Sequence, residues 1–544
     1  MVLTLASSLL LILSFPKFSF WPLAWFSFVP LFYTLRREKT FGEAFLHSYL
    51  FGFFFFLVSV EWLRHVAYIG WIFVATVYPL FFGFFGLAVH WLWRRNHFFL
   101  SLFILPSLWC VLEWTRAEMP VWGFGWNLLA YTQSFNLTIA SIASFIGAYG
   151  LSWIILFANL AIFFILDFEF SHKKSEGIIA LVGILALTVI FGVYFSYDFL
   201  KNEKLQNQMG TIQIAVIQGN IPQSQKWDPA YKNKILDIYE KLTYLAGGQD
   251  RKPDLIIWPE AAYPGFFNVD PENQRVSRLA QVLKIPILLG GLHLDRSDPK
   301  IERYYNSAYF IDPIENKENR YDKIRLVSFG EYVPWRKFFN FFGLERLAYS
   351  LGVSDFEPGS EMKVFSLKSN VIASEAKQSH SFEIASLALR PPRNDGLLKE
   401  EKFSVLICFE DMFPYLARDA VHKGAEFLIV ITNDAWFGKS AAPDQHLEGS
   451  IFRALENDVP VIRSANTGIS AIITREGKIL DWVKDKSGHD TFIAGGLSGA
   501  VSVGSGNTFY QKWGYQIPFF CLIFILAGFI LALVKPISDP KEYD

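Results

Sequence analysis

Residues 403–411, Phe-Ser-Val-Leu-Ile-Cys-Phe-Glu-Asp, decide how the second half of the chain folds. An almost wholly apolar run without polar alternation is typical of a β-strand that is buried on both faces of its sheet. Cys408 closes this run, and two acidic residues follow within three positions. Because sites in α/β proteins form where buried strands end, this cysteine occupies a natural position for chemistry.

Similar apolar runs recur through residues 201–510, where they alternate with polar, helix-like stretches such as 229–246 and 412–424. This alternation predicts an α/β domain whose sheets are covered on both faces. The expected strands lie at 211–218, 254–258, 285–289, 307–311, 403–408, 427–432, 459–464, 469–474 and 491–495. Residues 369–400 lack strand alternation and contain two consecutive prolines, so we interpret them as a surface insertion.

The rest of the 544-residue chain is far more apolar: 52% of all residues are hydrophobic, and the mean hydropathy is +0.26. A spanning helix needs about 20 mostly apolar residues. Candidate spans lie near 2–15, 18–34, 43–62, 68–93, 97–115, 139–167, 178–198 and 517–534. The first lacks a basic leading segment and a cleavage site, which favours an uncleaved helix over a signal peptide.

This pattern predicts three regions. Residues 1–200 form a seven-helix membrane domain, residues 201–514 form the α/β domain with its 369–400 insertion, and residues 515–544 add an eighth helix and a tail.

Lysine and arginine counts predict the side that the α/β domain faces, because cytoplasmic loops are enriched in both residues. With a cytoplasmic N-terminus, the inside segments carry nine such residues: Arg36, Arg37, Lys39, Arg94, Arg95, Lys173, Lys174, Lys535 and Lys541. The outside loops carry three: Lys17, Arg64 and Arg116. Seven spans precede the α/β domain, so we expect it outside the cytoplasm, with both termini inside. A cytoplasmic domain would require one miscounted span and would invert the charge bias.

Residues 120–126, Pro-Val-Trp-Gly-Phe-Gly-Trp, lie in an expected outward loop and are rich in tryptophan and glycine. A belt of interfacial aromatic side chains explains this composition without any function, and we favour that interpretation. The alternative is a re-entrant wall of a lipid-binding cleft.

Charge and cysteine usage exclude several classes of protein. A net charge of −1 and a pI near 6.8 give no sign of a nucleic-acid-binding surface. Cys110 and Cys521 lie in apolar spans, which leaves Cys408 alone in the α/β domain and without a disulfide framework. The ten histidines are scattered without the spacing of a zinc site, so no metal is expected.

Three segments of the α/β domain carry side chains suited to catalysis. Trp258-Pro-Glu260 places a carboxylate after a buried strand, and residues 406–411 place Cys408 in the same way. Tyr321-Asp-Lys323 supplies an ammonium group and precedes Phe-Gly-Glu331-Tyr-Val-Pro. Taken alone, these residues have ordinary explanations: Cys408 as a small buried hydrophobe, Glu260 as a helix cap and Lys323 as a solvated charge.

Together the three segments resemble the nitrilase superfamily, whose catalytic Glu, Lys and Cys come from three such places. With membrane helices on both sides, the chain is similar to the membrane-bound branch, the bacterial apolipoprotein N-acyltransferases. Residues 218–227, 433–438 and 463–468 also look like that branch, and the resemblance covers the whole chain except 369–400. It implies an α-β-β-α sandwich.

The resemblance further implies catalytic roles for Glu260, Lys323 and Cys408. It also assigns supporting carboxylates and substrate-binding side chains: Glu331, Glu410, Trp227 and Phe409. Phe409 stands where the family usually has tyrosine, so no role can rest on that hydroxyl group.

Elementary chemistry agrees with these catalytic assignments. A thiol with a pKa near 8.5 is mostly protonated at neutral pH and needs a base, which Glu260 can supply. Lys323 can stabilise the thiolate and then the oxyanion of a tetrahedral intermediate.

The implied reaction is acyl transfer from a phospholipid, through a Cys408 thioester, to the α-amino group of the diacylglyceryl-cysteine of an apolipoprotein. No cofactor and no nucleic acid take part, and the expected protein is a monomer in the bacterial inner membrane with a periplasmic catalytic domain. The alternative enzyme is a membrane-bound amidase that hydrolyses a C–N bond. A non-enzymatic transporter or scaffold would carry intramembrane charges, and the spans are nearly free of them.

Overall fold

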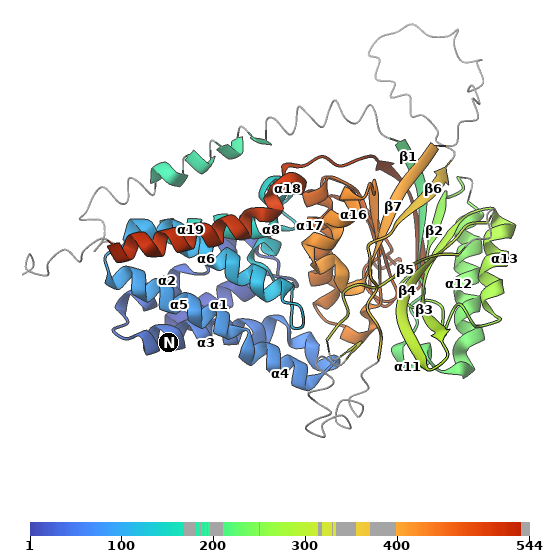
Figure 1. Ribbon diagram of the computed structural model, residues 1–544, viewed down its shortest axis with the longest axis horizontal. Helices are drawn as coiled ribbons and strands as arrows, with labels where there is room; N and C mark the ends of the chain where they lie inside the picture. The colour runs from blue at the N-terminus through green and yellow to red at the C-terminus, as the bar shows by residue number, and fades with distance from the viewer. Residues whose placement is uncertain are drawn as a thin grey trace, which may run out of the picture.

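The chain forms a helical bundle and a two-sheet domain that lie end to end (Figure 1). The computed structural model describes residues 1–167, 181–195 except 185, 189 and 193, 210–249, 251–313, 318–328, 330–332, 355–369 and 399–534. One continuous cluster of buried apolar side chains runs from the bundle into the second sheet. The two parts therefore share a hydrophobic core rather than meeting at a polar linker.

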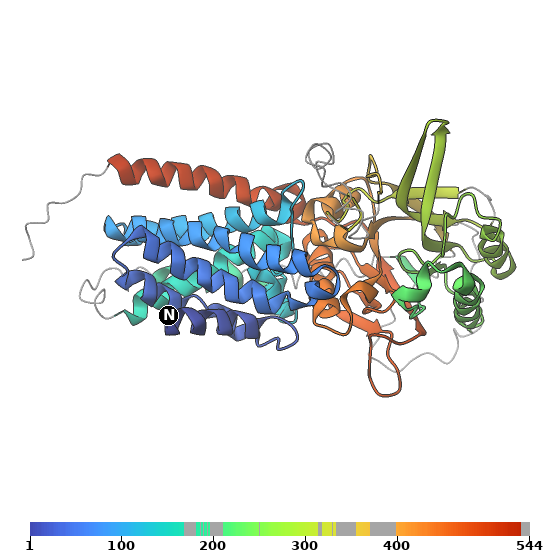
Figure 2. The same cartoon turned by 90° about the horizontal axis from the view of Figure 1, so that it is seen from below.

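The bundle consists of long apolar helices with nearly parallel axes (Figure 2). Within the part of the chain that the structure describes, five helical stretches are long and apolar enough to cross a membrane: Phe41–Ser59, Tyr68–Arg94, Phe98–Glu118, Ala143–Leu166 and Gly514–Leu533. They correspond to α3, Phe41–Ser59; α4 and α5, Tyr68–Val77 and Pro79–Arg94; α6, Phe98–Glu118; α8, Ala143–Leu166; and α19, Ile517–Val534. The protein is thus a multi-pass membrane protein, and α19 returns from the end of the chain to pack against α6.

The expected span at residues 18–34 is wrong. Residues 18–34 are not one helix but a short 3-10 turn, Trp21–Trp25, followed by the nine-residue α2, Val29–Arg37. Pro22 and Pro30 occupy the first turns of these elements, because proline begins a helix readily but cannot continue one. The first helix, α1, has only 13 residues, Val2–Ser14. The expected 178–198 span lies partly outside the described residues, which include an apolar helix at Leu181–Gly192.

Two six-stranded sheets form the other part of the molecule. The first has the order β12-β1-β2-β3-β4-β5, and the second has the order β11-β10-β9-β8-β7-β6. Their bounds are β1 Gly210–Gln218, β2 Leu255–Ile257, β3 Ile287–Asp298, β4 Ile301–Ile311, β5 Glu318–Asp322, β6 Val364–Ser369, β7 Lys399–Ile407, β8 Phe427–Thr432, β9 Val461–Ala465, β10 Ala471–Ile473, β11 Ile479–Trp482 and β12 Gly495–Val503. The central strands β1-β2-β3 and β7-β8-β9 run parallel, and the outer pairs run antiparallel.

Most of the predicted strands are confirmed, but the one at 491–495 is wrong. The chain there extends without strand pairing, and β12 begins only at Gly495, where pairing with Gln218 of β1 starts. Sequence reading also missed β5, β6 and β11, which lie at or near sheet edges and carry many polar side chains.

Helices cover both outer faces of this sandwich, as the resemblance implied. α12, Lys232–Gly247, and α13, Asn273–Leu283, cover the first sheet, whereas α16, Pro414–His422, and α17, Ala442–Asn457, cover the second (Figure 1). α17 lies between the second sheet and the bundle, and its residues from Ala442 to Asn457 are buried apart from Asp444. The prediction of helices near 229–246 and 412–424 is confirmed.

The 369–400 segment falls between two paired strands. β6 and β7 are antiparallel neighbours, and Ser369 is paired with Lys399 at the end of their register. Residues 399 and 400 belong to β7, whereas residues 370–398 lie outside the described residues. The described chain therefore leaves the sheet and returns to it at one pair of facing residues.

Candidate active site

Cys408 directly follows β7 and begins a sharp turn. It is the first residue of a 3-10 helix, Cys408–Met412, and its φ of 53° lies in the left-handed region. This backbone conformation is uncommon for a residue with a side chain, and such strained positions concentrate at functional sites. The turn places Cys408 at the carboxyl end of β7.

Glu260 and Lys323 reach the same place from the first sheet. Glu260 follows β2, and Lys323 follows β5, with its Nζ 3.6 Å from Oε1 of Glu260. Both side chains are buried, and the charges of both act on the Cys408 thiol. The structure thus brings together the three residues that the sequence analysis singled out.

The resting thiol is held in its protonated form. Burial raises the pKa of Cys408 far above its ordinary value, and the Glu260 carboxylate raises it further, while Lys323 opposes both. Burial alone would lower the pKa of Lys323, but Glu331 and Glu260 outweigh it and raise that pKa. Lys323 therefore stays charged, whereas the neighbouring Cys408 thiol stays protonated until a base accepts its proton.

Both oxygens of Glu260 are oriented by hydrogen bonds. Nδ2 of Asn306 donates to Oε1 of Glu260 at 2.8 Å and to Oε1 of Glu331 at 2.9 Å, and the backbone N–H of Asn433 donates to Oε2 of Glu260 at 2.9 Å. Nζ of Lys323 donates to Oε1 of Glu331 at 2.9 Å. Asn306 was missed by sequence reading; its only signal was a polar residue directly before a predicted strand.

Glu410 connects the turn Cys408–Met412 to the segment that carries Lys323. It accepts hydrogen bonds from the Tyr321 hydroxyl at 2.9 Å and from the backbone N–H groups of Ile324 and Ile407 at 2.7 and 2.8 Å. Burial raises the pKa of Glu410 to about 7, although these backbone bonds lower it. The ring of Phe409 packs edge-on against Phe413, with 4.8 Å between centroids.

The three further motifs of the sequence analysis also meet beside the triad. Nδ2 of Asn433 donates to Oε1 of Gln223 at 3.0 Å, and Nδ2 of Asn466 donates to Oδ1 of Asn433 at 2.9 Å. Lys226 is buried, and its Nζ donates to the backbone carbonyl of Glu260 at 3.0 Å. Burial lowers the pKa of Lys226 to about 8. The neighbouring Trp227, in contrast, is 44% exposed.

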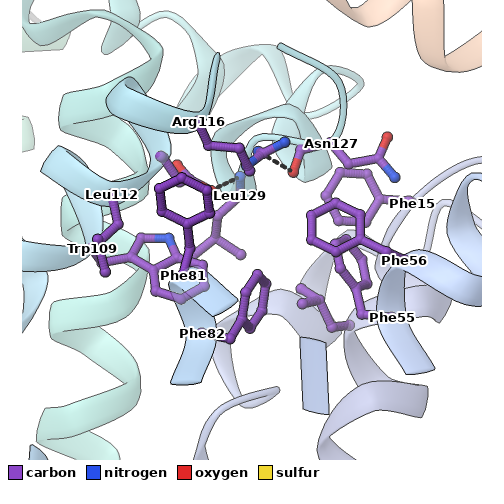
Figure 3. A pocket seen from close by; sticks show the side chains of 12 residues that line it. Phe15, Phe55, Phe56, Phe81, Phe82, Trp109, Leu112, Arg116, Asn127 and Leu129 are labelled. Carbon is purple, nitrogen blue, oxygen red and sulfur yellow. Dashed lines mark hydrogen bonds between the residues drawn. The ribbon is translucent and has the colours of Figure 1, made fainter. Parts of the chain in front are cut away.

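The tryptophan- and glycine-rich segment 120–126 lies between the bundle and the turn Cys408–Met412. Arg116 of α6 donates hydrogen bonds to the backbone carbonyls of Phe124 and Trp126 at 2.8 and 2.9 Å. It also donates to the backbone carbonyl of Asn127, and Arg116 and Asn127 both line an aromatic pocket in the bundle (Figure 3). A Cβ on Gly125 would lie 2.7 Å from the Met412 carbonyl oxygen, so only glycine fits there. Trp126 is buried against protein, so its ring does not belong to a lipid-facing belt.

Among the residues that the structure describes, no group of three or more His, Cys, Asp or Glu side chains could hold a metal ion. The reactive groups that meet at this site are the Cys408 thiol, the Glu260 carboxylate and the Lys323 ammonium.

The chain is similar to known proteins along almost its whole length. Residues 7–161 match the apolipoprotein N-acyltransferase N-terminal domain, and residues 213–494 match the carbon-nitrogen hydrolase family. The chain is 33% identical to an apolipoprotein N-acyltransferase of Geobacter metallireducens, over 96% of this chain and 93% of that one. It is 30% identical to the enzyme of the same name from Haemophilus influenzae, over 98% and 95% of the two chains. Among solved structures, Nit3 of Saccharomyces cerevisiae matches 54% of this chain and 90% of its own, at 18% identity and a TM-score of 0.35.

Proposed function

The chain belongs to the apolipoprotein N-acyltransferase family of the nitrilase superfamily, and we propose that it transfers the acyl chain through a thioester on Cys408. The proposed donor is a phospholipid, and the proposed acceptor is the α-amino group of the N-terminal diacylglyceryl-cysteine of an apolipoprotein. The observation that carries the proposal is the meeting of Cys408, Glu260 and Lys323 at the ends of three strands.

In the first half-reaction, Glu260 takes the thiol proton as Sγ of Cys408 attacks an ester carbonyl of the phospholipid. The oxyanion that forms is stabilised by the Lys323 ammonium, and one such donor contributes roughly 3–4 kcal/mol. The C–O bond then breaks, and Glu260 returns the proton to the departing lysophospholipid. The raised pKa of the thiol fits this sequence, because it keeps the nucleophile protonated until the base and the substrate are both in place.

In the second half-reaction, the amino group of the acceptor attacks the thioester. Glu260 accepts a proton from the amine, the S–C bond breaks, and the Cys408 thiolate regains that proton. A thioester is converted to a more stable amide, so the transfer needs neither a nucleotide nor a redox cofactor.

Both substrates are lipids, which explains why this site adjoins a membrane bundle. We propose that residues 201–514 lie on the periplasmic side of the bacterial inner membrane, with residues 1–200 and 515–544 anchoring them. The support is the excess of lysine and arginine on the opposite side. Exposed Trp227 and half-buried Phe409 are the proposed contacts for substrate chains, with Glu331 and Glu410 orienting the lysine and the nucleophile turn.

The test is a transfer assay with purified full-length protein, an acyl-labelled phospholipid and a peptide bearing a diacylglyceryl-cysteine. Transfer predicts N-acylated peptide and lysophospholipid in equal amounts. Release of free fatty acid with no acylated peptide would favour a hydrolase instead.

A further inference from the structure

A second buried cluster of charges lies directly behind the nucleophile turn. His446 of α17 is completely buried, with Nε2 2.9 Å from Oδ1 of Asp411 and Nδ1 3.0 Å from Oδ1 of Asp434. Arg463 reaches the other oxygens of the same two carboxylates, with Nη1 3.0 Å from Oδ2 of Asp411 and Nη2 3.2 Å from Oδ2 of Asp434. The four side chains form a closed ring in which cations and anions alternate.

The ring fixes the protonation state of His446. A neutral imidazole has a single N–H, so one of its nitrogens would turn a lone pair toward a carboxylate. An imidazolium donates to both carboxylates and makes the ring neutral, with two positive and two negative groups. Burial and the Arg463 charge lower the pKa of His446, but Asp411 and Asp434 outweigh them and raise it to about 9.

One carboxylate lies in the turn of Cys408, and the other lies in a turn that contacts Glu260. Asp411 lies in the turn Cys408–Met412, and Asp434 follows Asn433, whose N–H orients Glu260. Oγ1 of Thr432 also donates to Oδ1 of Asp434 at 2.9 Å. The Asp434 charge reaches the nucleophile as well, since it raises the pKa of the Cys408 thiol.

Side chains from the N-terminal half of the chain contact His446 and its neighbours in α17. The Trp126 ring lies over the imidazole ring, with 5.1 Å between centroids. In the same helix, Gln445 accepts a hydrogen bond from Nε1 of Trp62 at 2.9 Å, and Glu448 accepts one from Ser134 at 3.0 Å. α17 therefore connects the bundle to the turns that hold the nucleophile and its base.

We propose that His446 is a positioning residue that acts as an imidazolium: it holds the Cys408 and Asn433 turns together and cancels a buried negative charge beside the nucleophile. The inference rests on the proposed role of Cys408. The charged groups that face His446 are Asp411, Asp434 and Arg463. Those that face Cys408 are Glu260, Lys323, Asp434 and Lys226.

Alkylation of Cys408 by iodoacetamide tests the charge directly, because the reagent reacts with the thiolate and needs no lipid. The full-length protein would carry C110A and C521A so that a single cysteine remains, and intact mass would follow the reaction. His446→Gln leaves the ring with one uncompensated negative charge, so alkylation at about pH 8 should slow at least about tenfold, which corresponds to one pKa unit.

Charge compensation separates this role from a purely structural one. H446Q/D434N removes more hydrogen bonds than H446Q but restores neutrality, so alkylation should recover to within about threefold of the parent. Ser450→Ala removes a 2.6 Å hydrogen bond to Asp411 without a charge change, and it should leave the rate within the same range. A double variant as slow as H446Q, or H446Q as fast as the parent, would overturn the proposal.

A measurement on the unsubstituted protein covers the case in which the variants fail to fold. With ¹⁵N-labelled histidine, one buried residue should keep the imidazolium signature at both ring nitrogens up to about pH 8. Loss of every imidazolium signal by about pH 7 would contradict the proposal. If alkylation recovers in H446Q/D434N but the parent protein transfers no acyl chain, the proposed function is wrong and this role of His446 still holds.

Discussion

Nζ of Lys323 lies 2.9 Å from Oε1 of Glu331, and only 1% of the lysine side chain and 14% of the glutamate side chain are exposed. The distance from the same ammonium to Glu260 is longer, at 3.6 Å. Glu331 thus provides the nearer counter-charge for Lys323. Glu260, the proposed base, is therefore paired less closely with the Lys323 ammonium than Glu331 is.

Glu331→Gln should damage both the reaction and the fold. With its nearer partner neutral, Lys323 pairs with Glu260 alone and weakens that carboxylate as a base, so thioester formation should slow at least about tenfold. Breaking a buried ion pair should also lower the free energy of unfolding by about 3 kcal/mol. Pre-steady-state acylation and thermal unfolding measure the two effects. Glu302→Gln on β4, where Glu302 forms an exposed ion pair with Arg296 of β3, is the matched control and should leave both quantities unchanged. An unaltered acylation rate in E331Q would contradict this account.

The base and the ammonium should respond differently to pH. Glu260→Gln removes the base and also a charge that raises the thiol pKa, whereas Lys323→Ala removes a charge that lowers it. Both variants should form little acyl-Cys408 near neutral pH. Raising the pH to about 9 supplies thiolate without a base, and it should rescue acylation in E260Q more than in K323A. Equal rescue in the two variants, or rescue in neither, would mean that these roles are assigned wrongly.

The pairing of Ser369 with Lys399 predicts that the segment between them is dispensable. Replacing residues 370–398 by Asn-Gly would join β6 and β7 through a two-residue hairpin turn, the connection that antiparallel strands favour. Acyl transfer should persist, and the unfolding temperature should change by no more than a few degrees. Expression and transfer assays check this outcome. Failure to fold would show that the removed residues pack into the domain.

His446 should make the stability of the protein depend on pH. Its folded-state pKa of about 9 lies above the ordinary value near 6.5, so the folded chain holds this proton more tightly than the unfolded chain. The stabilisation is complete below about pH 6.5 and is lost as the pH rises through about 9, a change on the order of 3 kcal/mol. Unfolding temperatures measured across this interval should fall in the parent protein and stay flatter in H446Q. A parent protein that gains stability over the interval would contradict the ring.

Two of the three proposed catalytic residues could be located from the pattern of the sequence, because Glu260 and Cys408 each follow an apolar strand. The ends of buried strands can be recognised locally, whereas Lys323 follows the polar strand β5 and was singled out only by the resemblance to the nitrilase superfamily. Their neighbours cannot be recognised in this way. Asn306 and His446 look like ordinary polar residues until the two sheets stack and α17 packs behind them.

The errors in predicting the fold have equally local causes. Hydropathy alone treated residues 18–34 as one span, although Pro22 and Pro30 each begin a new element there. The polar strand β5 shows no apolar run, since it takes its shape from pairing with β4 rather than from its own side chains.

The central claim is that acyl chains pass through Cys408, and intact mass spectrometry tests it most directly. The full-length protein would be incubated with a single phospholipid species, quenched in acid and weighed, before and after addition of a diacylglyceryl-cysteine peptide. We expect one acyl group on the parent protein and none on Cys408→Ala, and we expect the peptide to clear the adduct as N-acylated peptide forms. Acylation of the peptide by C408A at the parent rate, or an adduct that the peptide does not clear, would contradict this claim.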